Sequence, residues 1–423
     1  MQRAFIMRHD DRGGNGPDDG DMTETLSTQA GSSGAPGASG APGGRLALLD
    51  VLRGTAVLGT LMTNVWVFTA PGAEGAILRG AGGAPGFTSP SDGAETLFRL
   101  LADGKFLSML TLLFGVGLAI QFDSAARRGL PWPGTYRGRA LFLLAEGTVH
   151  FVLVFAWDVL MGYAVTALLV ARLLTRSDRA RRRVMWWAGG LHLLLMGGLT
   201  AALVASGEQG GAGTGGNVPR RVVELYAHGG YPDQIAFRLE NAVALRLEPV
   251  LSFGLLVFLF LLGVRLYRAG AFGAGTAGRR IRARMLRWGL GLGVPLTALS
   301  ALAGPDGFLL GRYCAAPLVA VGYIGLIGAA VDRVRREGWF TKGLTSVGRT
   351  ALSAYVLQNV LCVLVSYGIG LGLAERLGES GRPWWVMALW AAVCAVLMGG
   401  SALWLRRFPR GPLESVQSRV LRR

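Results

Sequence analysis

The chain has 423 residues, 51% of them hydrophobic, and carries a formal net charge of +17. Several apolar runs reach the ~20 residues that a helix needs to cross a bilayer, which predicts a polytopic α-helical membrane protein. The runs show no two-residue alternation, and this excludes a transmembrane β-barrel. The basic residues cluster in short loops between the runs, as in the cytoplasmic loops of membrane proteins, so we expect no nucleic-acid partner.

The segments on either side of the apolar runs divide the chain into three parts. Residues 1–44 are predicted to be a disordered, low-complexity cytoplasmic tail, because their Gly-, Ser- and Pro-rich second half cannot bury a core. Residues 45–405 are the predicted transmembrane helical domain, and residues 406–423 are a basic cytoplasmic tail. Arginine vastly outnumbers lysine, which is typical of a GC-rich bacterial genome. We therefore expect a multi-pass protein of a bacterial cytoplasmic membrane.

About ten membrane spans with both termini in the cytoplasm satisfy every loop, which makes the predicted fold an all-α helix bundle. The inner loops are dense in arginine, whereas the outer turns at 157–158 and 304–307 contain none. Residues 206–243 are the largest outer segment, and their second half is predicted to be helical and interfacial. The predicted spans are residues 46–68, 100–122, 139–156, 158–174, 184–205, 249–267, 288–303, 308–330, 350–373 and 384–405.

The first span carries polar residues inside an apolar run. Asp50 and Arg53 are three positions apart, so they share a helix face and can pair. Asn64 follows eleven positions after Arg53, which returns to nearly the same face ~16 Å further along the helix. Because a charge within a span costs roughly 2.5–3.5 kcal/mol, such residues usually pair or carry function. We expect this polar stripe to face the protein interior.

His150 is the strongest candidate for chemistry. It lies near the outer end of the third predicted span, with Glu146 one helical turn earlier and Asp158 across the predicted turn. A histidine beside a carboxylate is the usual arrangement of a general base, because the carboxylate fixes the tautomer and stabilises the imidazolium. The alternative is that His150 only hydrogen-bonds a neighbouring helix.

Several different short motifs follow one another along most of residues 45–420. They are LDVLRG at 49–54 with Asn64 after it, GKF at 104–106, LLFGVGLA at 112–119, Gly147 and His150 followed by Asp158 and Tyr163, Arg238 after Tyr226 and Gly230, GRTALSAY at 348–355 with Gln358 after it, and RGPLE at 410–414. Together they resemble the YeiB-like family, domain-of-unknown-function family 418. That family resembles the wider group of transmembrane acyltransferases, in part of which a histidine stands at the position of Asn64.

The resemblance implies acyl transfer across the membrane, from an acyl-CoA-like donor in the cytoplasm to an acceptor hydroxyl or amine outside. His150 is then the base, Asp158 orients it, and Asn64 donates a hydrogen bond to the developing oxyanion. Structural alternatives remain open for the other polar residues, such as an architectural Asp50–Arg53 pair or a helix anchor at Arg349. The candidates for binding the donor or the substrate are Asp50, Arg53, Arg238, Arg349, Tyr355 and Gln358.

Two other functions remain open, so the sequence does not decide whether the chain is an enzyme. One is a transporter or flippase of a small or envelope-related molecule, and the other is a non-catalytic membrane partner of an enzyme complex. Acyl-CoA is expected only as a co-substrate, without a resident cofactor or metal, because Cys314, Cys362 and Cys394 form no CxxC motif. The expected partners are the lipid bilayer, an acyl donor and an envelope or small-molecule acceptor, and the oligomeric state is not indicated. Convergence of His150, Asn64 and Asp158 on one cavity favours the enzyme hypothesis.

Overall fold

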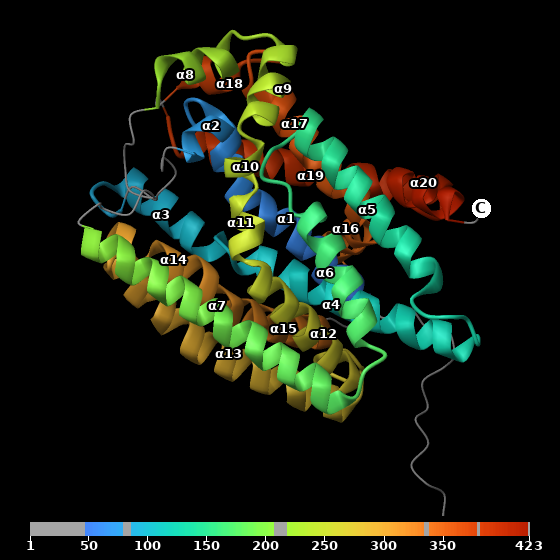
Figure 1. Cartoon of the computed structure of the whole chain (residues 1–423). Helices are drawn as coiled ribbons and strands as arrows, with labels where there is room; N and C mark the ends of the chain where they lie inside the picture. Colours follow the sequence, from blue (N-terminus) through green and yellow to red (C-terminus); the bar gives the residue numbers. More distant parts are fainter. Residues whose placement is uncertain (1–46, 79–85, 207–217, 334–337, 379–380, 422–423) are drawn as a thin grey trace, which may run out of the picture. The chain divides into compact units, whose positions relative to one another are not determined.

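The computed structural model describes residues 47–78, 86–206, 218–333, 338–378 and 381–421. The regular elements in these residues are helices, and no strand occurs in them, which confirms the predicted all-α class. The predicted tail of residues 1–44 lies outside this described part of the chain. Figure 1 shows the helices in chain order.

The helices of the first part of the chain include the predicted hairpin turn at 157–158, which lies between α5 and α6. They are α1 (Ala47–Thr69), α2 (Ala73–Ile77), α3 (Pro90–Ala102), α4 (Lys105–Arg127), α5 (Gly134–Leu153), α6 (Leu160–Leu173), α7 (Asp178–Ser206), α8 (Arg220–Ala227), α9 (Tyr231–Glu240), α10 (Ala242–Leu245) and α11 (Leu247–Leu251).

The second part contains a π-helical turn, η2, and a sharp bend between α16 and α17. Its elements are α12 (Phe253–Arg268), α13 (Thr276–Leu302), the 3₁₀ turn η1 (Gly304–Gly307), α14 (Phe308–Leu310), η2 (Gly311–Ala315), α15 (Ala316–Arg333), α16 (Trp339–Arg349), α17 (Ala351–Ser366), α18 (Leu373–Leu377), α19 (Trp384–Arg407) and α20 (Pro412–Val420). The helix axes of α16 and α17 differ in direction by 97°.

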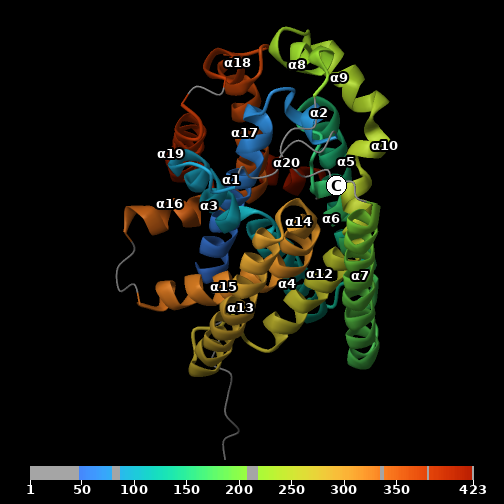
Figure 2. The same ribbon diagram turned by 90° about the vertical axis from the view of Figure 1, so that its left-hand side faces the viewer.

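Helix α1 lies among the other helices and packs against α4, α16, α17 and α19 (Figures 1 and 2). Its apolar side chains are buried along its whole length, from Leu52 through Leu61 to Val65. A helix that is apolar on nearly every face is suited to such a central position. Of the polar residues of α1, Asp50 is buried, 29% of the Arg53 side chain is exposed, and Asn64 is partly exposed.

Glycines allow neighbouring helices to approach within backbone contact. A Cβ added to Gly115 of α4 would overlap the backbone of Phe260 in α12, and a Cβ on Gly263 of α12 would overlap the carbonyl of Leu112 in α4. Small residues at a helix crossing are typical of membrane bundles, in which close packing replaces the hydrophobic driving force. These reciprocal contacts hold α4 and α12 together beside the site described below.

The predicted count of ten spans is not confirmed. Within the described residues, six helical segments are long and apolar enough to cross a membrane, and the bent pair α16–α17 would make a seventh. The predicted spans at 139–156, 158–174 and 249–267 coincide with helices α5, α6 and α12, which are not among the six. The six segments are Ala47–Thr69, Pro90–Arg127, Asp178–Ser206, Thr276–Leu302, Gly304–Arg333 and Trp384–Arg407.

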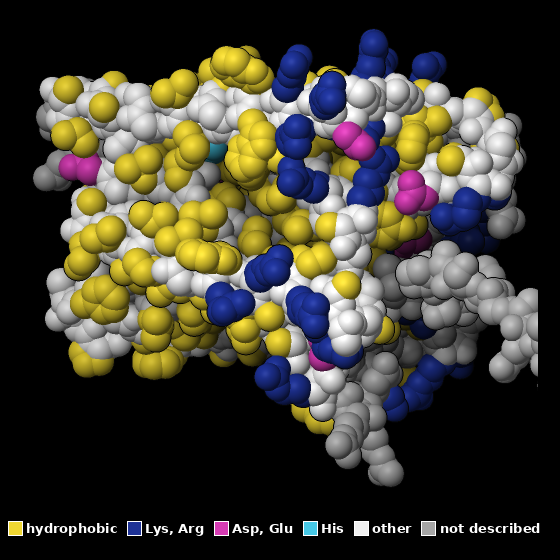
Figure 3. All heavy atoms as spheres, turned by 90° about the horizontal axis from the view of Figure 1, so that it is seen from below, with side chains coloured by type: hydrophobic (Ala, Val, Ile, Leu, Met, Phe, Trp, Pro, Cys, Tyr) yellow, Lys and Arg dark blue, Asp and Glu magenta, His cyan; other side chains and the backbone are white. Residues whose placement is uncertain are grey.

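The surface over α7 and α13 is divided into an apolar and a basic part (Figure 3). Large apolar side chains such as Trp187 and Leu194 of α7 and Leu299 of α13 are exposed along these helices. Exposed arginines gather at the N-terminal ends of the same two helices, and Arg182 and Arg284 are examples. An apolar face next to an arginine-rich end fits a protein that crosses a membrane with this end in the cytoplasm.

Candidate functional site

A cavity of about 610 Å³ lies at the ends of several helices. Its wall contains residues of the 157–159 turn and of the 305–306 turn, both of which the sequence predicts to be outside the cytoplasm. We call it the outer cavity. Apolar side chains such as Val67 and Leu251 make up much of the wall. The polar and aromatic residues in it are Thr60, Thr63, Asn64, Trp66, Arg99, Asp103, Trp157, Glu248, Asp306, Phe308, Arg312, Tyr313 and Tyr355.

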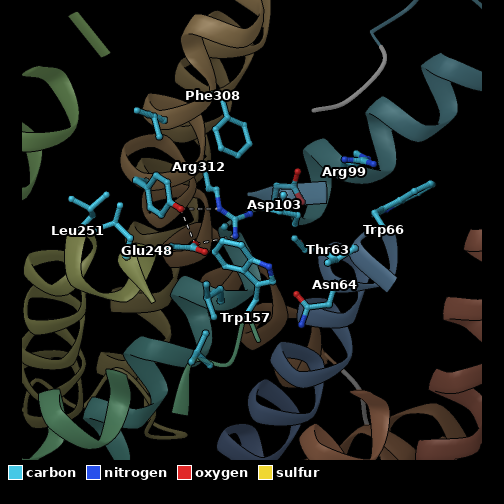
Figure 4. Close-up of a pocket in the computed structure, with 18 of the residues that line it drawn as sticks. Thr63, Asn64, Trp66, Arg99, Asp103, Trp157, Glu248, Leu251, Phe308 and Arg312 are labelled. Carbon is cyan, nitrogen blue, oxygen red and sulfur yellow. Dashed lines mark hydrogen bonds and ion pairs between the residues drawn. The ribbon is translucent and has the colours of Figure 1, made fainter. Parts of the chain in front are cut away.

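Asn64 of α1 lines the outer cavity, as Figure 4 shows. Its carboxamide makes no hydrogen bond to any residue that the structure describes, so both of its polar atoms remain available to a bound molecule. Thr63 precedes it and also lies on the wall. Of the three residues predicted to be catalytic, Asn64 is the one that lines this cavity.

Three side chains that were not predicted to be functional form a hydrogen-bonded network across the cavity from Asn64 (Figure 4). Nη2 of Arg312 donates to Oε1 of Glu248 at 3.2 Å, and the hydroxyl of Tyr313 donates to the same oxygen at 2.7 Å. Nε of Arg312 also donates to the Tyr313 hydroxyl at 3.3 Å. Both donors therefore hold one oxygen of the Glu248 carboxylate.

The π-helical turn η2 explains how two consecutive residues reach the same cavity. Arg312 and Tyr313 both belong to this turn, which is wider than an α-helical turn, and such turns often occur at functional sites. Gly104 packs against it from the break between α3 and α4, and a Cβ there would overlap the carbonyl oxygen of Arg312. Gly104 also has a φ of 74°, which favours glycine.

The break between α3 and α4 brings further charged residues to the wall. Arg99 pairs with Glu95 at 2.8 Å, and its guanidinium lies 4.7 Å from the ring centroid of Trp66. Asp103 follows at the end of α3 and also lines the cavity. The cavity wall thus carries both positively and negatively charged side chains close to aromatic rings.

Tyr355 is the second predicted residue on the wall, and it separates the outer cavity from Asp158. Its hydroxyl donates to Oδ1 of Asp158 at 3.4 Å, a long hydrogen bond. The other carboxylate oxygen of Asp158 accepts the backbone N–H groups of Leu160 and Met161 at 3.0 and 3.3 Å. Asp158 therefore also serves as a cap for the start of α6.

Arg246 holds Asp158 from the side of α10 and α11. Its Nη1 donates to the carbonyl of Asp158 at 2.7 Å, and its Nη2 lies 3.7 Å from the carboxylate. Burial lowers the pKa of Arg246, and the charge of Asp158 opposes that shift. Asp158 itself is fully buried, whereas 17% of the Arg246 side chain is exposed.

His150 is buried one layer behind the wall and is not among the residues that line the cavity. Its ring centroid lies 5.5 Å from that of Tyr355. Asn359 Nδ2 donates to His150 Nε2 at 3.1 Å, so Nδ1, which lies 3.8 Å from Glu146, carries the proton in this arrangement. Among the described residues, His150 therefore does not line the cavity that Asn64 lines, and its ring lies beside Tyr355, which does line it.

Three other candidate residues lie away from the cavity wall. Arg53 pairs with Asp50 at 3.6 Å, as predicted from their spacing. Arg349 ends α16 at the bend, where its Nη2 donates to the carbonyl of Pro409 at 3.5 Å. These residues come from the ends of helices that the sequence predicts to be cytoplasmic.

Gln358 of α17 also lies away from the cavity wall. Its side chain is fully buried, and its amide has no partner among the described residues.

Arg238 is neither solvated nor open to an outer ligand, because its side chain is completely buried. Its guanidinium donates to both oxygens of Glu74 and to the carbonyls of Val152 and Val154. Burial alone lowers the pKa of Arg238, but the Glu74 carboxylate outweighs it and holds that pKa above its usual value. Arg238 thus ties α9 to α2 and to the end of α5.

One signal in the sequence pointed to the residues that the prediction missed. Arg312 is a charged residue inside the predicted span 308–330, and intramembrane charges are functional candidates. Glu248 precedes a proline at the edge of another predicted span, where a solvated carboxylate is ordinary. Among the described residues, no group of three or more His, Cys, Asp or Glu side chains is arranged to hold a metal ion.

Comparisons with known proteins give a family match and two relatives. Residues 266–422 match the family model described as "Protein of unknown function (DUF418)". The uncharacterized protein YxaH of Bacillus subtilis (strain 168) is 26% identical over 386 residues, which cover 88% of this chain and 92% of the relative. The uncharacterized protein YeiB of Escherichia coli (strain K12) is 29% identical over 391 residues, covering 88% and 94%. No solved structure matches the chain.

Proposed function

This chain belongs to the YeiB-like family, domain-of-unknown-function family 418, and from that premise we propose that it is a membrane acyltransferase whose reaction takes place in the outer cavity. The observation that carries the proposal is the composition of the cavity wall. A largely apolar space meets the unpartnered amide of Asn64 on one side and Tyr355 on another. Such a space suits an acyl chain with a polar reacting group at its end.

The chemistry assigns a role to each wall residue. An acceptor hydroxyl or amine attacks the carbonyl carbon of an acyl thioester, the new bond to that carbon forms, and the carbon–sulfur bond breaks. The Asn64 amide donates to the carbonyl oxygen as negative charge develops on it. The acceptor loses a proton and the leaving thiolate gains one, so the charges balance.

The buried residues behind the wall act through Tyr355. Tyr355 is the residue of this cluster that both lines the cavity and contacts Asp158. We assign protonation of the leaving thiolate to the Tyr355 hydroxyl, which Asp158 orients by accepting its hydrogen bond and which regains a proton from water in the cavity. His150 lies beside the same ring and supports Asp158 electrostatically rather than touching the substrate.

The donor enters from the cytoplasmic end in this proposal. Arg53 lies on nearly the same helix face as Asn64, ~16 Å further toward that end, and Asp50 lies about one helical turn beyond Arg53. An extended acyl thioester can span this distance, so that Arg53 contacts the phosphates of an acyl-CoA while the thioester reaches the cavity. Bacterial relatives support a place in a bacterial cytoplasmic membrane.

The proposal is tested by comparing the envelope lipids, glycans and secreted small molecules of a deletion strain with those of the complemented strain by mass spectrometry. We expect one species to lose the mass of an acyl group on deletion and to regain it with the wild-type gene. Complementation with Asn64→Ala or Tyr355→Phe, at wild-type abundance in the membrane, should not restore it. A species that keeps its acyl groups but changes sides of the membrane would instead support a transporter.

A further inference from the structure

Glu248 is the carboxylate of the outer cavity whose two oxygens have different surroundings. Oε1 accepts from Tyr313 at 2.7 Å and from Arg312 at 3.2 Å. Oε2 accepts no hydrogen bond from any residue that the structure describes. The Glu248 side chain, 25% of which is exposed, lines the outer cavity.

The two donors fix the direction of the carboxylate. Arg312 and Tyr313 belong to the same π-helical turn, η2, and Gly104 packs closely against this turn. Glu248 itself belongs to the short helix α11, whose C-terminal neighbour Ser252 donates from its hydroxyl and from its backbone N–H to the Glu248 carbonyl. A carboxylate held on one oxygen from the side chain and at its own backbone has little freedom to turn. Its free oxygen therefore keeps one direction.

Glu248 and Asn64 lie on opposite sides of the pocket, with Trp157 between them (Figure 4). In an acyl transfer the carbonyl oxygen and the attacking group lie on different sides of the reacting carbon. We propose that Glu248 takes the proton from the acyl acceptor, with Arg312 and Tyr313 as its positioning residues. This inference rests on the proposed function. It gives Glu248 the role of general base that the family resemblance implied for His150.

In the proposed acyl transfer, each bond that forms replaces one that breaks, and each proton that moves is returned. The acceptor O–H or N–H proton passes to Oε2 of Glu248 while the acceptor atom bonds to the acyl carbon. The carbon–sulfur bond then breaks, and the thiolate takes a proton from Tyr355. Glu248 releases its proton to water in the cavity, Tyr355 takes a proton back from that water, and the enzyme returns to its starting state.

The test uses the full chain in lipid nanodiscs, with acetyl-CoA as the donor probe. One acceptor is an envelope extract of the deletion strain, and the other is hydroxylamine, whose neutral amine attacks a thioester without a base. We expect Glu248→Gln to lower transfer to the extract ~10²–10⁴-fold, the usual effect of losing a general base, and to keep transfer to hydroxylamine. Formate should restore part of the transfer by Glu248→Ala, because it supplies a carboxylate to the vacated space.

Controls separate this inference from loss of fold and from failure of the proposed function. Glu240→Gln makes the same change on an exposed glutamate of α9 and should behave as wild type. Glu248→Asp keeps a carboxylate and should retain more transfer than Glu248→Gln if the glutamine variant proves unstable. A Glu248→Gln protein that transfers to the extract at the wild-type rate, or a folded Glu248→Ala protein that formate does not rescue, overturns the inference while the proposed function stands. A wild-type protein that transfers to neither acceptor overturns both.

Discussion

Arg238 and Glu74 form a buried bidentate ion pair, with Nε and Nη2 of the arginine 3.1 and 3.0 Å from the two carboxylate oxygens. Neither side chain is exposed. Tyr367 and the backbone N–H of Ala156 donate to the same carboxylate. The pair therefore joins four segments that are far apart in the sequence, and it lies in the part of the chain predicted to be outside.

Removing one member of this pair should destabilise the protein strongly. Arg238→Gln leaves the Glu74 carboxylate buried without its partner, which typically costs about 3–5 kcal/mol. The measurement is thermal unfolding in detergent. The matched control is His228→Gln, which breaks the exposed pair with Glu375 and should change the unfolding temperature little. Equal unfolding temperatures for both variants would show that the buried pair is dispensable.

The orientation of the chain can be checked with reporter fusions. Fusions at residues 180 and 275 should report the cytoplasm, because residue 180 lies in the arginine-rich first turn of α7 and residue 275 directly precedes the arginine-rich start of α13. Fusions at residues 225 and 305 should report the outside. A cytoplasmic signal at 225 or at 305 would mean that the outer cavity opens to the wrong compartment for the proposed acceptor.

The contact between α1 and α16 should tolerate no added methyl group. A Cβ on Gly348 would overlap the backbone of Asp50, which cannot move without shifting α1. We expect Gly348→Ala to lower both the amount of protein in the membrane and its unfolding temperature. Gly399→Ala in α19 has nothing within 4 Å of its new Cβ and should be neutral or slightly stabilising. If both variants insert and unfold alike, the helix contact is looser than described.

Tyr355 and Asp158 should act as one unit. Tyr355→Phe removes the hydroxyl that contacts Asp158, and Asp158→Asn keeps a side chain that can cap α6 but not the carboxylate. Residues that act as a unit give non-additive losses. We expect the double variant to transfer acyl groups no more slowly than the slower single variant, measured in nanodiscs at matched protein amounts. Losses that multiply would show that the two residues work separately.

The sequence was sufficient to predict the helical class and the Asp50–Arg53 pair, because both follow from residue patterns along single helices. It did not predict that His150 lies behind Tyr355, because the depth of a side chain depends on how α5 and α17 pack. The burial of Arg238 in an ion pair was not predicted for the same reason, because its partner Glu74 is distant in the chain. The span count was uncertain because short apolar helices such as α6 resemble membrane spans.

Arg312 shows a different limit of sequence reasoning. Its charge inside an apolar run was a visible signal, but the direction of its side chain depends on the π-helical turn. Such a turn inserts one residue into the helical repeat, so the usual 100° per residue no longer tells which side a residue faces. Glu248 gave no signal of its own and became a candidate only through Arg312 and Tyr313.

If acyl transfer takes place in the outer cavity, as we propose, a bulky side chain that fills this cavity should abolish the transfer. The measurement is the rate of acyl transfer from acetyl-CoA to envelope extract by Thr63→Trp, whose indole would occupy space beside Asn64. Thr148→Trp makes the same change on an exposed position of α5 and serves as the control. We expect Thr63→Trp to lose nearly all transfer while it unfolds at the temperature of the control. A Thr63→Trp protein that transfers acyl groups at the rate of the control would contradict it.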